Sequence, residues 1–449
     1  MELNKLTSIS PIDGRYRTQV AHVDEYFSEY ALMKYRVFIE IEYFLFLAKE
    51  NFFILTPKAK KELKNIANTF TLKDALAIKE IEKTTHHDIK AVEYFLKQKL
   101  QSIGATSLTE WIHFGLTAQD INNTAIPLLW KDAIQQVYLP TVTHIQQQLQ
   151  QLATQWKAIP MLARTHGQPA SPTLLGKELM VFVERIQHQI HLFTQIPFSA
   201  KFGGAVGNFN AHHAAFPKKN WILLGNKFVE QTLHLQRQQF TTQIEHYDNI
   251  AAQFDTMKRI NTILIDLCRD VWTYISMNYF KQKIKQDEVG SSTMPHKINP
   301  IHFENAEGNL GLANALFEHL SAKLPTSRLQ RDLTDSTVLR NIGMPVAHTI
   351  LAIQSINKGL KSLVLNKPQI IADLENNWAV IAEGIQTILR REKYTEPYEA
   401  LKTLTRKHSN ITQKNIHQFI DTLNISTNLK KELKKLTPFN YVGVIPKIG

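Results

Sequence analysis

A run of apolar residues at helical spacing, beginning at Ile250, constrains the fold of this chain more than any other feature. Its members follow one another at steps of three or four residues: Ile250, Phe254, Met257, Ile260, Leu264 and Leu267. Such a stripe is typical of a long helix with one buried face. Similar patterns run through residues 28–50, 173–196, 302–323 and 347–364, and no convincing series of alternating strands accompanies them. The sequence therefore predicts an all-α fold.

Changes in helix length along the chain predict three helical domains. Residues 1–111 contain several shorter helical patterns with loops between them. Residues 112–363 contain the longest patterns, as expected of a central long-helix bundle. The pattern restarts near Pro368, so residues 364–449 are expected to form a shorter, more basic helical domain. A chain of 449 residues is long enough for two or three domains with a large buried core.

The chain is basic, with a formal net charge of +12 and a pI of about 9.4. A basic balance alone permits a nucleic-acid or membrane-surface partner. However, the two small basic clusters, at residues 58–64 and 429–435, each carry a glutamate and alternate with leucine. The solvated face of an amphipathic helix has this composition. We therefore expect a small, multiply anionic metabolite as the ligand rather than nucleic acid.

Cysteine usage and apolar run length both bear on the compartment. Cys268 is the only cysteine, which excludes an internal disulfide and a zinc site built on several thiolates. It lies in an apolar run, where a buried and inert thiol is expected. No apolar run reaches the ~18 residues that a membrane span needs, and residues 1–16 lack the apolar segment of a secretory signal. We therefore expect a cytoplasmic protein without a membrane partner.

Five polar stretches interrupt the helical patterns and are candidates for a site. In the first, His86, His87 and Asp88 precede an amphipathic helix. These side chains can belong to a functional site. Alternatively, Thr84 or Thr85 simply caps that helix, with a charge near its N-terminus as a dipole partner.

The second and third stretches place polar groups where loops lead into helices. Residues 111–123 include Thr117, whose hydroxyl and neighbouring backbone N–H groups can hold a carboxylate or merely cap the helix. Residues 162–178 contain the run Arg-Thr-His-Gly-Gln, with His166 at its centre. A lone histidine is more often structural, but several converging donors in one loop favour a site for an anionic ligand.

The fourth stretch, GSSTMPHKINP at residues 290–300, cannot form a regular helix because of its glycine and prolines. Lys297 and Asn299 are two positions apart in this extended stretch, so both side chains can face one ligand. A simple Gly/Ser linker is the alternative, but it would not explain why Met, His, Lys and Asn are packed between the prolines.

The fifth stretch places Arg331, Ser336 and Arg340 at spacings of five and four residues. If a helix begins near Asp335, then Ser336 and Arg340 share one face. Arginine is the preferred bidentate partner of phosphate, so the stretch indicates a phosphate site. A salt-bridged helix surface is the alternative.

Together these stretches resemble the fumarase/aspartase superfamily. GSSTMPHKINP fits the superfamily signature GSSxMPxKxNP closely. Within the superfamily the chain is similar to the adenylosuccinate lyase family of the bacterial purine-biosynthesis type, through the segments SPIDGRY, TTHHDIKAVEYFLK, RTHGQPA, GGAVGNFNAH, TTQIE and QRDLTDSTVLRN. The resemblance is colinear from about residue 8 to the C-terminus.

The resemblance implies a fold, an assembly and an activity. The fold would be three all-helical domains, with the central bundle joining four subunits into a homotetramer whose active sites are shared between subunits. The activity would be β-elimination in de novo purine biosynthesis. It would cleave adenylosuccinate to AMP and fumarate, and the succinyl-carboxamide ribonucleotide SAICAR to AICAR and fumarate. No cofactor and no metal are implied.

The resemblance also implies roles for individual residues. Ser291 would be the base, and His166 the acid that protonates the departing nitrogen. Glu304 would pair with His166, and His87 would support catalysis near the phosphate. The substrate-binding residues would be Arg15, Tyr16, His86, Asp88, Thr117, Gln243, Ser292, Lys297, Asn299, Arg331, Ser336, Thr337 and Arg340.

Two positions depart from the family pattern. Ala118 stands where many relatives have serine, so one hydroxyl contact to the fumaryl carboxylate would be missing or replaced, an effect of at most ~1–2 kcal/mol. His86 stands where close relatives have asparagine and would add positive charge near the phosphate at low pH. Neither change removes a residue on which the proposed chemistry depends.

Two other interpretations stay open at the level of sequence. The signature loop alone does not exclude another fumarate-releasing lyase of the superfamily, such as argininosuccinate lyase. The arginine and serine set at residues 331–340 argues against it, because those substrates carry no phosphate. A basic helical scaffold that kept the fold without the activity is the non-enzymatic alternative.

Overall fold

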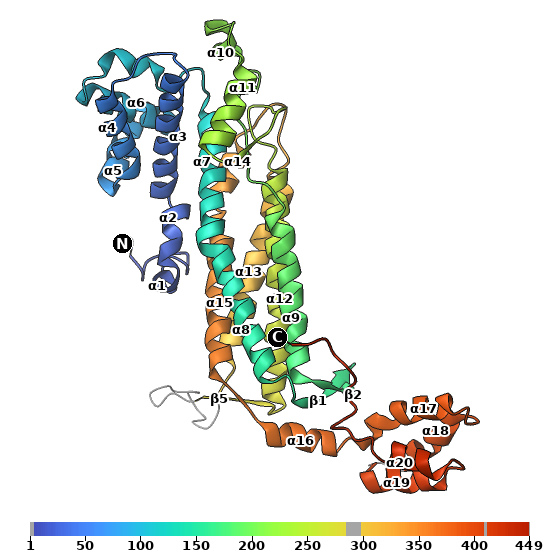
Figure 1. Cartoon of the computed structure of the whole chain (residues 1–449). Coiled ribbons are helices and arrows are strands. Elements are labelled where there is room, and N and C mark those ends of the chain that lie inside the picture. The colour runs from blue at the N-terminus through green and yellow to red at the C-terminus, as the bar shows by residue number, and fades with distance from the viewer. Residues whose placement is uncertain (1–3, 284–297, 408–410, 449) are drawn as a thin grey trace. The chain divides into compact units, whose positions relative to one another are not determined.

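The computed structural model describes residues 4–283, 298–407 and 411–448. Most of this chain is helical, and Figure 1 traces the elements in order from the blue N-terminus to the red C-terminus. The contacts divide the chain into two compact units. The first unit comprises residues 1–142, 189–262 and 308–353, and the second comprises residues 143–188, 263–307 and 354–449.

Five long helices contribute residues to both units, because the chain passes from one unit to the other within them. They are α8 (Leu139–Gln155), α9 (Leu175–Thr194), α12 (Asp248–Ser276), α13 (Ile301–Lys323) and α15 (Gly343–Ser362). The helical patterns read from the sequence at 173–196, 302–323 and 347–364, and the run from Ile250, correspond to four of these helices. Those predictions are confirmed, and with them the all-α fold class.

The first unit contains most of the shorter helices. Its remaining elements are α1 (Arg17–Val20), η1 (Ala21–Val23), α2 (Asp24–Phe27), α3 (Glu29–Lys49), α4 (Pro57–Asn68), α5 (Leu72–Thr85), α6 (Asp88–Ser102), η2 (Thr106–Trp111), α7 (Ala118–Ala133), η3 (Ile134–Tyr138), β3 (Ser199–Ala200), α10 (Asn210–Ala215), α11 (Trp221–Asn226), η4 (Lys227–Thr232), β4 (Gln236–Arg237) and α14 (Thr334–Leu339).

Helix α3 is the central element of the first unit, as its apolar composition predicts. Ser28 caps it, because the serine hydroxyl accepts a hydrogen bond from Ala31 N at 3.1 Å. The helix buries two faces in two different apolar clusters. Val37, Ile41 and Phe44 belong to one cluster, and Ile39, Tyr43 and Phe46 belong to the other. A helix that is apolar nearly all round must be buried nearly all round.

The second unit carries the short strands and the C-terminal helices. Its remaining elements are β1 (Pro160–Thr165), β2 (Gln168–Leu174), β5 (Phe280–Gln282), β6 (Leu363–Leu365), α16 (Lys367–Glu375), η5 (Trp378–Ile381), α17 (Ala382–Arg391), α18 (Pro397–Lys407), α19 (Gln413–Thr422) and α20 (Thr427–Leu433). The C-terminal helices enclose an apolar cluster of their own, with Trp378, Ile385, Leu389 and Ile420 fully or almost fully buried.

The structure adds strands that the sequence did not predict. They pair as three two-stranded sheets, β1 with β2 antiparallel, β3 with β4 parallel and β5 with β6 antiparallel. Each is too short or too polar to give an alternating apolar pattern. The three-domain division at residues 111 and 363 is a different partition from the two contact units, and it stays a prediction.

The structure also bears on two further predictions, one about the cysteine and one about membrane-spanning helices. Cys268 is buried in α12, so the prediction of a buried thiol is confirmed, and burial raises the pKa of that thiol. Among the described helices, none combines the length and the apolar character that crossing a bilayer would require.

Candidate active site

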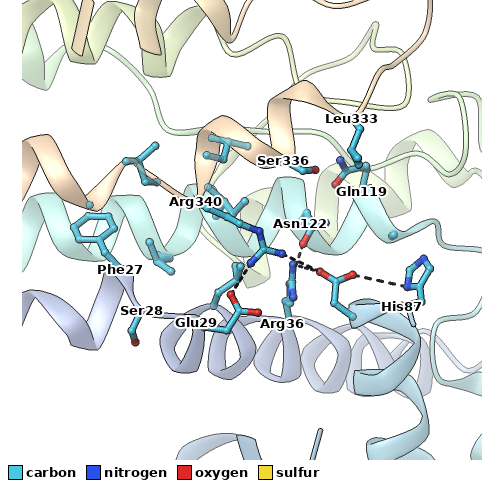
Figure 2. A pocket seen from close by; sticks show the side chains of 18 of the residues that line it. Phe27, Ser28, Glu29, Arg36, His87, Gln119, Asn122, Leu333, Ser336 and Arg340 are labelled. Carbon is cyan, nitrogen blue, oxygen red and sulfur yellow. Dashed lines mark hydrogen bonds and ion pairs between the residues drawn. The ribbon is translucent and has the colours of Figure 1, made fainter. Parts of the chain in front are cut away.

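A cavity of about 440 Å³ in the first unit gathers many of the predicted site residues. Its walls come from α2 and α3, from the junction of α5 and α6, from the start of α7, and from α14 with the residues that follow it (Figure 2). The predicted residues that line it are His86, His87, Asp88, Arg331, Ser336 and Arg340. Stretches separated by more than 240 positions in the sequence thus contribute to one cavity.

The junction of α5 and α6 presents two histidines. His86 ends α5 in the left-handed conformation, with φ of 50°. His87 caps α6, because its Nδ1 atom accepts a hydrogen bond from Lys90 N at 3.2 Å. A ring whose Nδ1 accepts carries its neutral-form proton on Nε2. The alternative in which Thr84 or Thr85 caps the helix is wrong, since Thr85 is the last residue of α5 and α6 begins at Asp88.

A cluster of two arginines and two carboxylates forms one wall of the cavity (Figure 2). Asp88 Oδ2 lies 2.8 Å from Arg36 Nη2 and 3.6 Å from Arg340 Nη2. Arg340 Nη1 also donates to Glu29 Oε2 at 2.6 Å. Burial would raise the pKa of Asp88, but the Arg36 charge, aided by hydrogen bonds and by Arg340, lowers it overall. Asp88 is therefore an anion that holds both guanidinium groups at the cavity.

Arg36 is a residue of this cavity that was not predicted from the sequence. Its side chain is almost fully buried, and Nε donates to Asn122 Oδ1 at 2.9 Å. The sequence feature that could have identified Arg36 is the presence of a charged residue within the apolar stretch that forms α3, one turn before the equally buried Glu40. A charge in that position must be paired, and a buried pair next to a cavity indicates a site.

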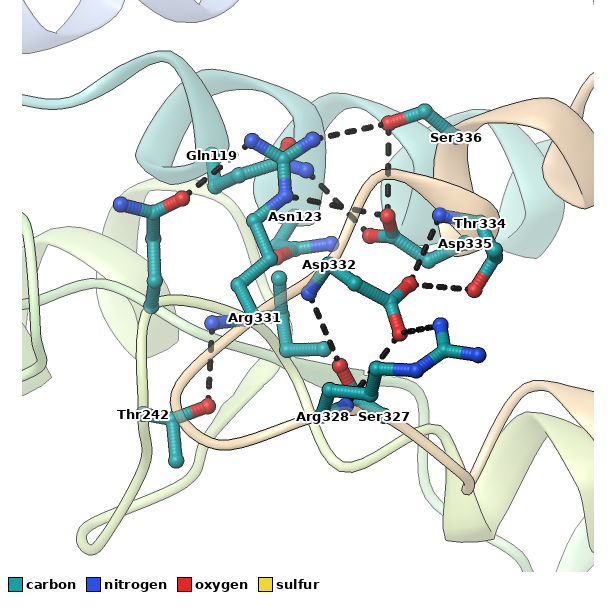
Figure 3. A network of polar contacts seen from close by, with 12 residues as sticks. Gln119, Asn123, Thr242, Ser327, Arg328, Arg331, Asp332, Thr334, Asp335 and Ser336 are labelled. Carbon is teal, nitrogen blue, oxygen red and sulfur yellow. Dashed lines mark hydrogen bonds and ion pairs between the residues drawn. The ribbon is translucent and has the colours of Figure 1, made fainter.

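Arg331 is held by other predicted site residues (Figure 3). Its Nη2 donates to Ser336 Oγ at 3.0 Å, and its Nη1 donates to Gln243 Oε1 at 3.2 Å. Helix α14 begins at Thr334 and ends just before Arg340, so the prediction of a helix starting near Asp335 is confirmed. Two guanidinium groups and a hydroxyl therefore line the same cavity, as a site for a phosphate requires.

Thr117 lies at the start of α7, where the sequence predicted a loop entering a helix. Its backbone N–H donates to Asp120 Oδ2 at 2.9 Å. Asp120 is fully buried and also accepts from Lys201 Nζ at 2.8 Å and from Gly203 N at 2.9 Å. Ala118, one of the two departures from the family pattern, lines the cavity. The carboxylate of Asp120 thus fixes the turn that leads to the cavity.

Several predicted residues of the first unit do not line this cavity. Arg15 and Tyr16 precede α1, where the Arg15 side chain is exposed and its guanidinium lies 5.9 Å from the Tyr16 ring. Gln243 is not among the lining residues, but it accepts a hydrogen bond from one of them, Arg331. The Thr337 side chain is exposed on α14.

His166, the predicted acid, lies at the turn of a hairpin in the second unit. The turn joins β1 to β2, and both of its central residues have positive φ, 52° at His166 and 74° at Gly167. Two such residues form the turn whose twist matches an antiparallel pair. The imidazole is exposed. Behind the turn, Arg164 Nη2 donates to Asp373 Oδ2 at 2.9 Å.

Glu304, the predicted partner of His166, lies in the first turn of α13 and is exposed. Its Oε1 accepts a hydrogen bond from Trp272 Nε1 at 3.0 Å. Among the described residues no contact joins Glu304 to His166, so their pairing stays a prediction. Asn299 is half-buried at the end of the loop stretch. Ser291, Ser292 and Lys297 lie outside the described residues.

Glu245 is a buried carboxyl close to the site, two residues beyond Gln243. Burial is the main cause that raises its pKa to about 8, although hydrogen bonds from Tyr247 N and from Gln238 Nε2 oppose the shift. A carboxyl with a raised pKa keeps its proton in the folded state at a pH where the unfolded chain has lost it. The contribution of Glu245 to stability is therefore expected to fall as the pH rises from about 4.5 to about 8.

We expect Glu245→Gln to remove this pH dependence. Relative to the parent chain, the variant should gain stability as the pH rises, by roughly 3–5 kcal/mol between pH 4.5 and 8. Thermal unfolding at pH 5 and pH 8.5 measures the difference. Glu80→Gln, at a side chain that is 72% exposed, is the control and should show no such trend. A constant difference between Glu245→Gln and the parent chain at both pH values would refute the account.

Family models and known full-length proteins match this chain. A family model described as "Lyase" matches residues 14–314, and one described as "Adenylosuccinate lyase C-terminal" matches residues 327–442. The protein named adenylosuccinate lyase in Dictyostelium discoideum is 60% identical over 99% of this chain and 98% of its own length. The protein of that name in Escherichia coli K12 is 47% identical over the same shares of the two chains.

Solved structures agree at the level of the fold. A fumarate lyase from Mesorhizobium sp. BNC1 matches with a TM-score of 0.74 at 16% identity, over 94% of this chain and 95% of its own. A 3-carboxy-cis,cis-muconate lactonizing enzyme from Pseudomonas putida matches with a TM-score of 0.74 at 18% identity, over 94% of both chains. From the family models and the full-length relatives, this chain belongs to the adenylosuccinate lyase family of the fumarase/aspartase superfamily.

Proposed function

We propose that this chain is an adenylosuccinate lyase, a C–N lyase of de novo purine biosynthesis. It would cleave adenylosuccinate to AMP and fumarate, and SAICAR to AICAR and fumarate. The observation that carries the proposal is the single cavity that gathers the histidine pair at 86–87, Asp88, Arg331, Ser336 and Arg340. The names of the full-length relatives support it.

The cavity suits a substrate that carries a phosphate. Arg331 and Arg340 offer two permanent cations, Ser336 offers a hydroxyl, and the N–H on Nε2 of His87 is available as a further donor. Argininosuccinate, malate and aspartate carry no phosphate that could bind to these cations. The same cavity also has an apolar side, formed by Phe27, Leu32, Ile126, Leu129 and Leu339, against which a flat base can lie.

The elimination itself needs a base, an acid and positive charge near the developing carbanion. In the proposed mechanism Ser291 removes the proton from the carbon next to a carboxylate of the succinyl group. His166 then protonates the departing nitrogen, with Glu304 favouring the cationic ring. Lys297 and Asn299 hold the succinyl carboxylates, with Thr117, Ser292 and Gln243 nearby. These roles rest on the family resemblance.

The proposal includes a cytoplasmic homotetramer whose sites draw residues from more than one copy. The resemblance implies this assembly. Size measurement by light scattering tests it, and a monomer that turns over adenylosuccinate at full rate would contradict it.

Loss of one phosphate contact tests the role of the cavity. We expect Arg340→Ala to raise KM for adenylosuccinate ~10- to 100-fold with a smaller effect on kcat, because a charge-assisted hydrogen bond contributes ~1.5–3 kcal/mol. Arg328→Ala is the matched control. That arginine is 80% exposed, pairs with Asp332 and lies off the cavity. Equal KM values for the two variants would argue against a phosphate at Arg340.

A further inference from the structure

We infer that Tyr247 and Asp335 are positioning residues, which orient Arg331 for recognition of the substrate phosphate without touching the substrate themselves. The inference rests on the proposed function, because it assigns a purpose to groups behind the phosphate site. Neither residue lines the cavity, and both are buried, with 3% and 4% of their surfaces exposed.

The Arg331 guanidinium is held on three sides. Ser336 and Gln243 accept from its two terminal nitrogens, and both are themselves predicted substrate contacts. The third side, Nε, lies 3.7 Å from Asp335 Oδ1. That nitrogen is buried and has no hydrogen-bond partner among the described residues. The Asp335 carboxylate is therefore the anion that faces the Arg331 guanidinium (Figure 3).

The two oxygens of Asp335 face different groups. Oδ1 faces the site, 3.7 Å from Arg331 Nε and 3.5 Å from Ser336 Oγ. Oδ2 faces the core, where it accepts hydrogen bonds from Tyr247 OH at 2.9 Å and from Gln119 Nε2 at 3.3 Å. A carboxylate with one oxygen anchored in this way has its other oxygen fixed in direction.

The Tyr247 hydroxyl is itself held by a buried residue of α7. Tyr247 OH accepts from Asn123 Nδ2 at 2.8 Å, and Asn123 Oδ1 accepts from Glu245 N at 3.1 Å. Asn123 is 1% exposed. Burial and then the Asp335 charge raise the pKa of Tyr247, so its hydroxyl remains a donor to Asp335. The chain from Asn123 through Tyr247 and Asp335 to Arg331 therefore joins the start of α7 to the residue that we expect to bind phosphate.

Buried polar groups can also serve folding alone, so the test must distinguish an effect on the orientation of Arg331 from an effect on folding. Removing the Tyr247 hydroxyl leaves the ring in place but frees Asp335 Oδ2 from one of its two donors. Arg331 then keeps its charge and loses its fixed direction. The affinity for a phosphorylated ligand should therefore fall, whereas the affinity for the same ligand without its phosphate should not change.

The experiment compares Tyr247→Phe with Tyr138→Phe. Tyr138 is the matched control, because it is also buried and its hydroxyl has no hydrogen-bond partner among the described residues. Calorimetry measures the dissociation constants of AMP and of adenosine for the parent chain and for each variant. Steady-state rates are measured on adenylosuccinate and on its nucleoside lacking the phosphate.

We expect Tyr247→Phe to weaken AMP binding and to raise KM for adenylosuccinate by ~3- to 10-fold, as loss of one buried hydrogen bond does. Adenosine binding, turnover of the nucleoside and kcat should stay within about twofold of the parent values. Asp335→Asn, which keeps the side-chain shape, should weaken AMP binding further. It serves as the second variant if Tyr247→Phe folds poorly.

Two outcomes would overturn the inference. One is equal loss for the phosphorylated and unphosphorylated ligands, which is the result of a general structural defect. The other is AMP binding as tight in Tyr247→Phe and Asp335→Asn as in the parent chain. A parent chain that binds AMP more tightly than adenosine but does not cleave adenylosuccinate would refute the proposed function and leave the inference standing.

Discussion

Replacing His166 with alanine is expected to lower kcat on adenylosuccinate by roughly 10²- to 10⁴-fold, the usual contribution of a general acid. Without it, the departing nitrogen must leave without a proton from the protein. KM should change much less, because the imidazole acts on the leaving group rather than on the phosphate. Stopped-flow or steady-state absorbance assays of the purified variant measure both constants.

The turn conformation of His166 requires a careful control, because a left-handed residue is strained unless it is glycine or asparagine. His166→Asn tolerates this conformation and cannot act as an acid, so it should be as inactive as the alanine variant. His234→Ala is the matched control, since His234 is also exposed and has a similar φ of 54°. Turnover like that of the parent chain in either His166 variant would remove His166 from the mechanism.

Replacing Asp120 with alanine is expected to cost ~3–5 kcal/mol of stability, the usual result of leaving one member of a buried ion pair alone. The carboxylate and Lys201 are both fully buried, with Nζ and Oδ1 2.8 Å apart. Asp120 also accepts from the backbone N–H groups of Thr117, Gly203 and Gly204. Its loss would leave the ammonium without its counter-ion and three backbone donors without this acceptor. Urea-induced unfolding at pH 7 measures the effect.

Lys201, the other member of the buried ion pair, provides the control for Asp120→Ala. Lys201→Met removes the ammonium but leaves Asp120 with the three backbone donors, so we expect a smaller loss of stability than for Asp120→Ala. The two variants should also differ in activity. Only the loss of Asp120 releases the Thr117 turn at the cavity. A larger loss of stability in Lys201→Met than in Asp120→Ala would contradict the central role given to the carboxylate.

Long amphipathic helices were predictable from sequence to within a few residues. The run from Ile250 gave α12, and the pattern at 28–50 gave α3, because apolar spacing over many turns leaves little ambiguity. The β1–β2 hairpin was not predictable in the same way. Its strands contain proline and many polar residues, and its turn uses His166 and Gly167 where asparagine and glycine are the usual signal.

The site was predictable only in part, because its residues lie in segments that are far apart along the chain. Local patterns singled out residues 86–88 and 331–340, but their shared cavity emerges only when the chain is folded. Arg36 was missed because a charged residue in a helix normally indicates a solvated face. A threonine at position 84 or 85 was the alternative predicted for the helix cap, whereas the His87 ring fills that role. Tyr247 and Asn123 are 124 positions apart, and no local signal joins them.

The measurement that tests the account most directly is a side-by-side absorbance assay of the purified chain with adenylosuccinate, SAICAR and argininosuccinate at equal concentrations. The account predicts fumarate release from the first two substrates and none from the third, because only the first two carry the phosphate that the cavity's arginines would bind. Release of fumarate from argininosuccinate, with none from adenylosuccinate, would contradict the account and assign the chain to another reaction of the superfamily.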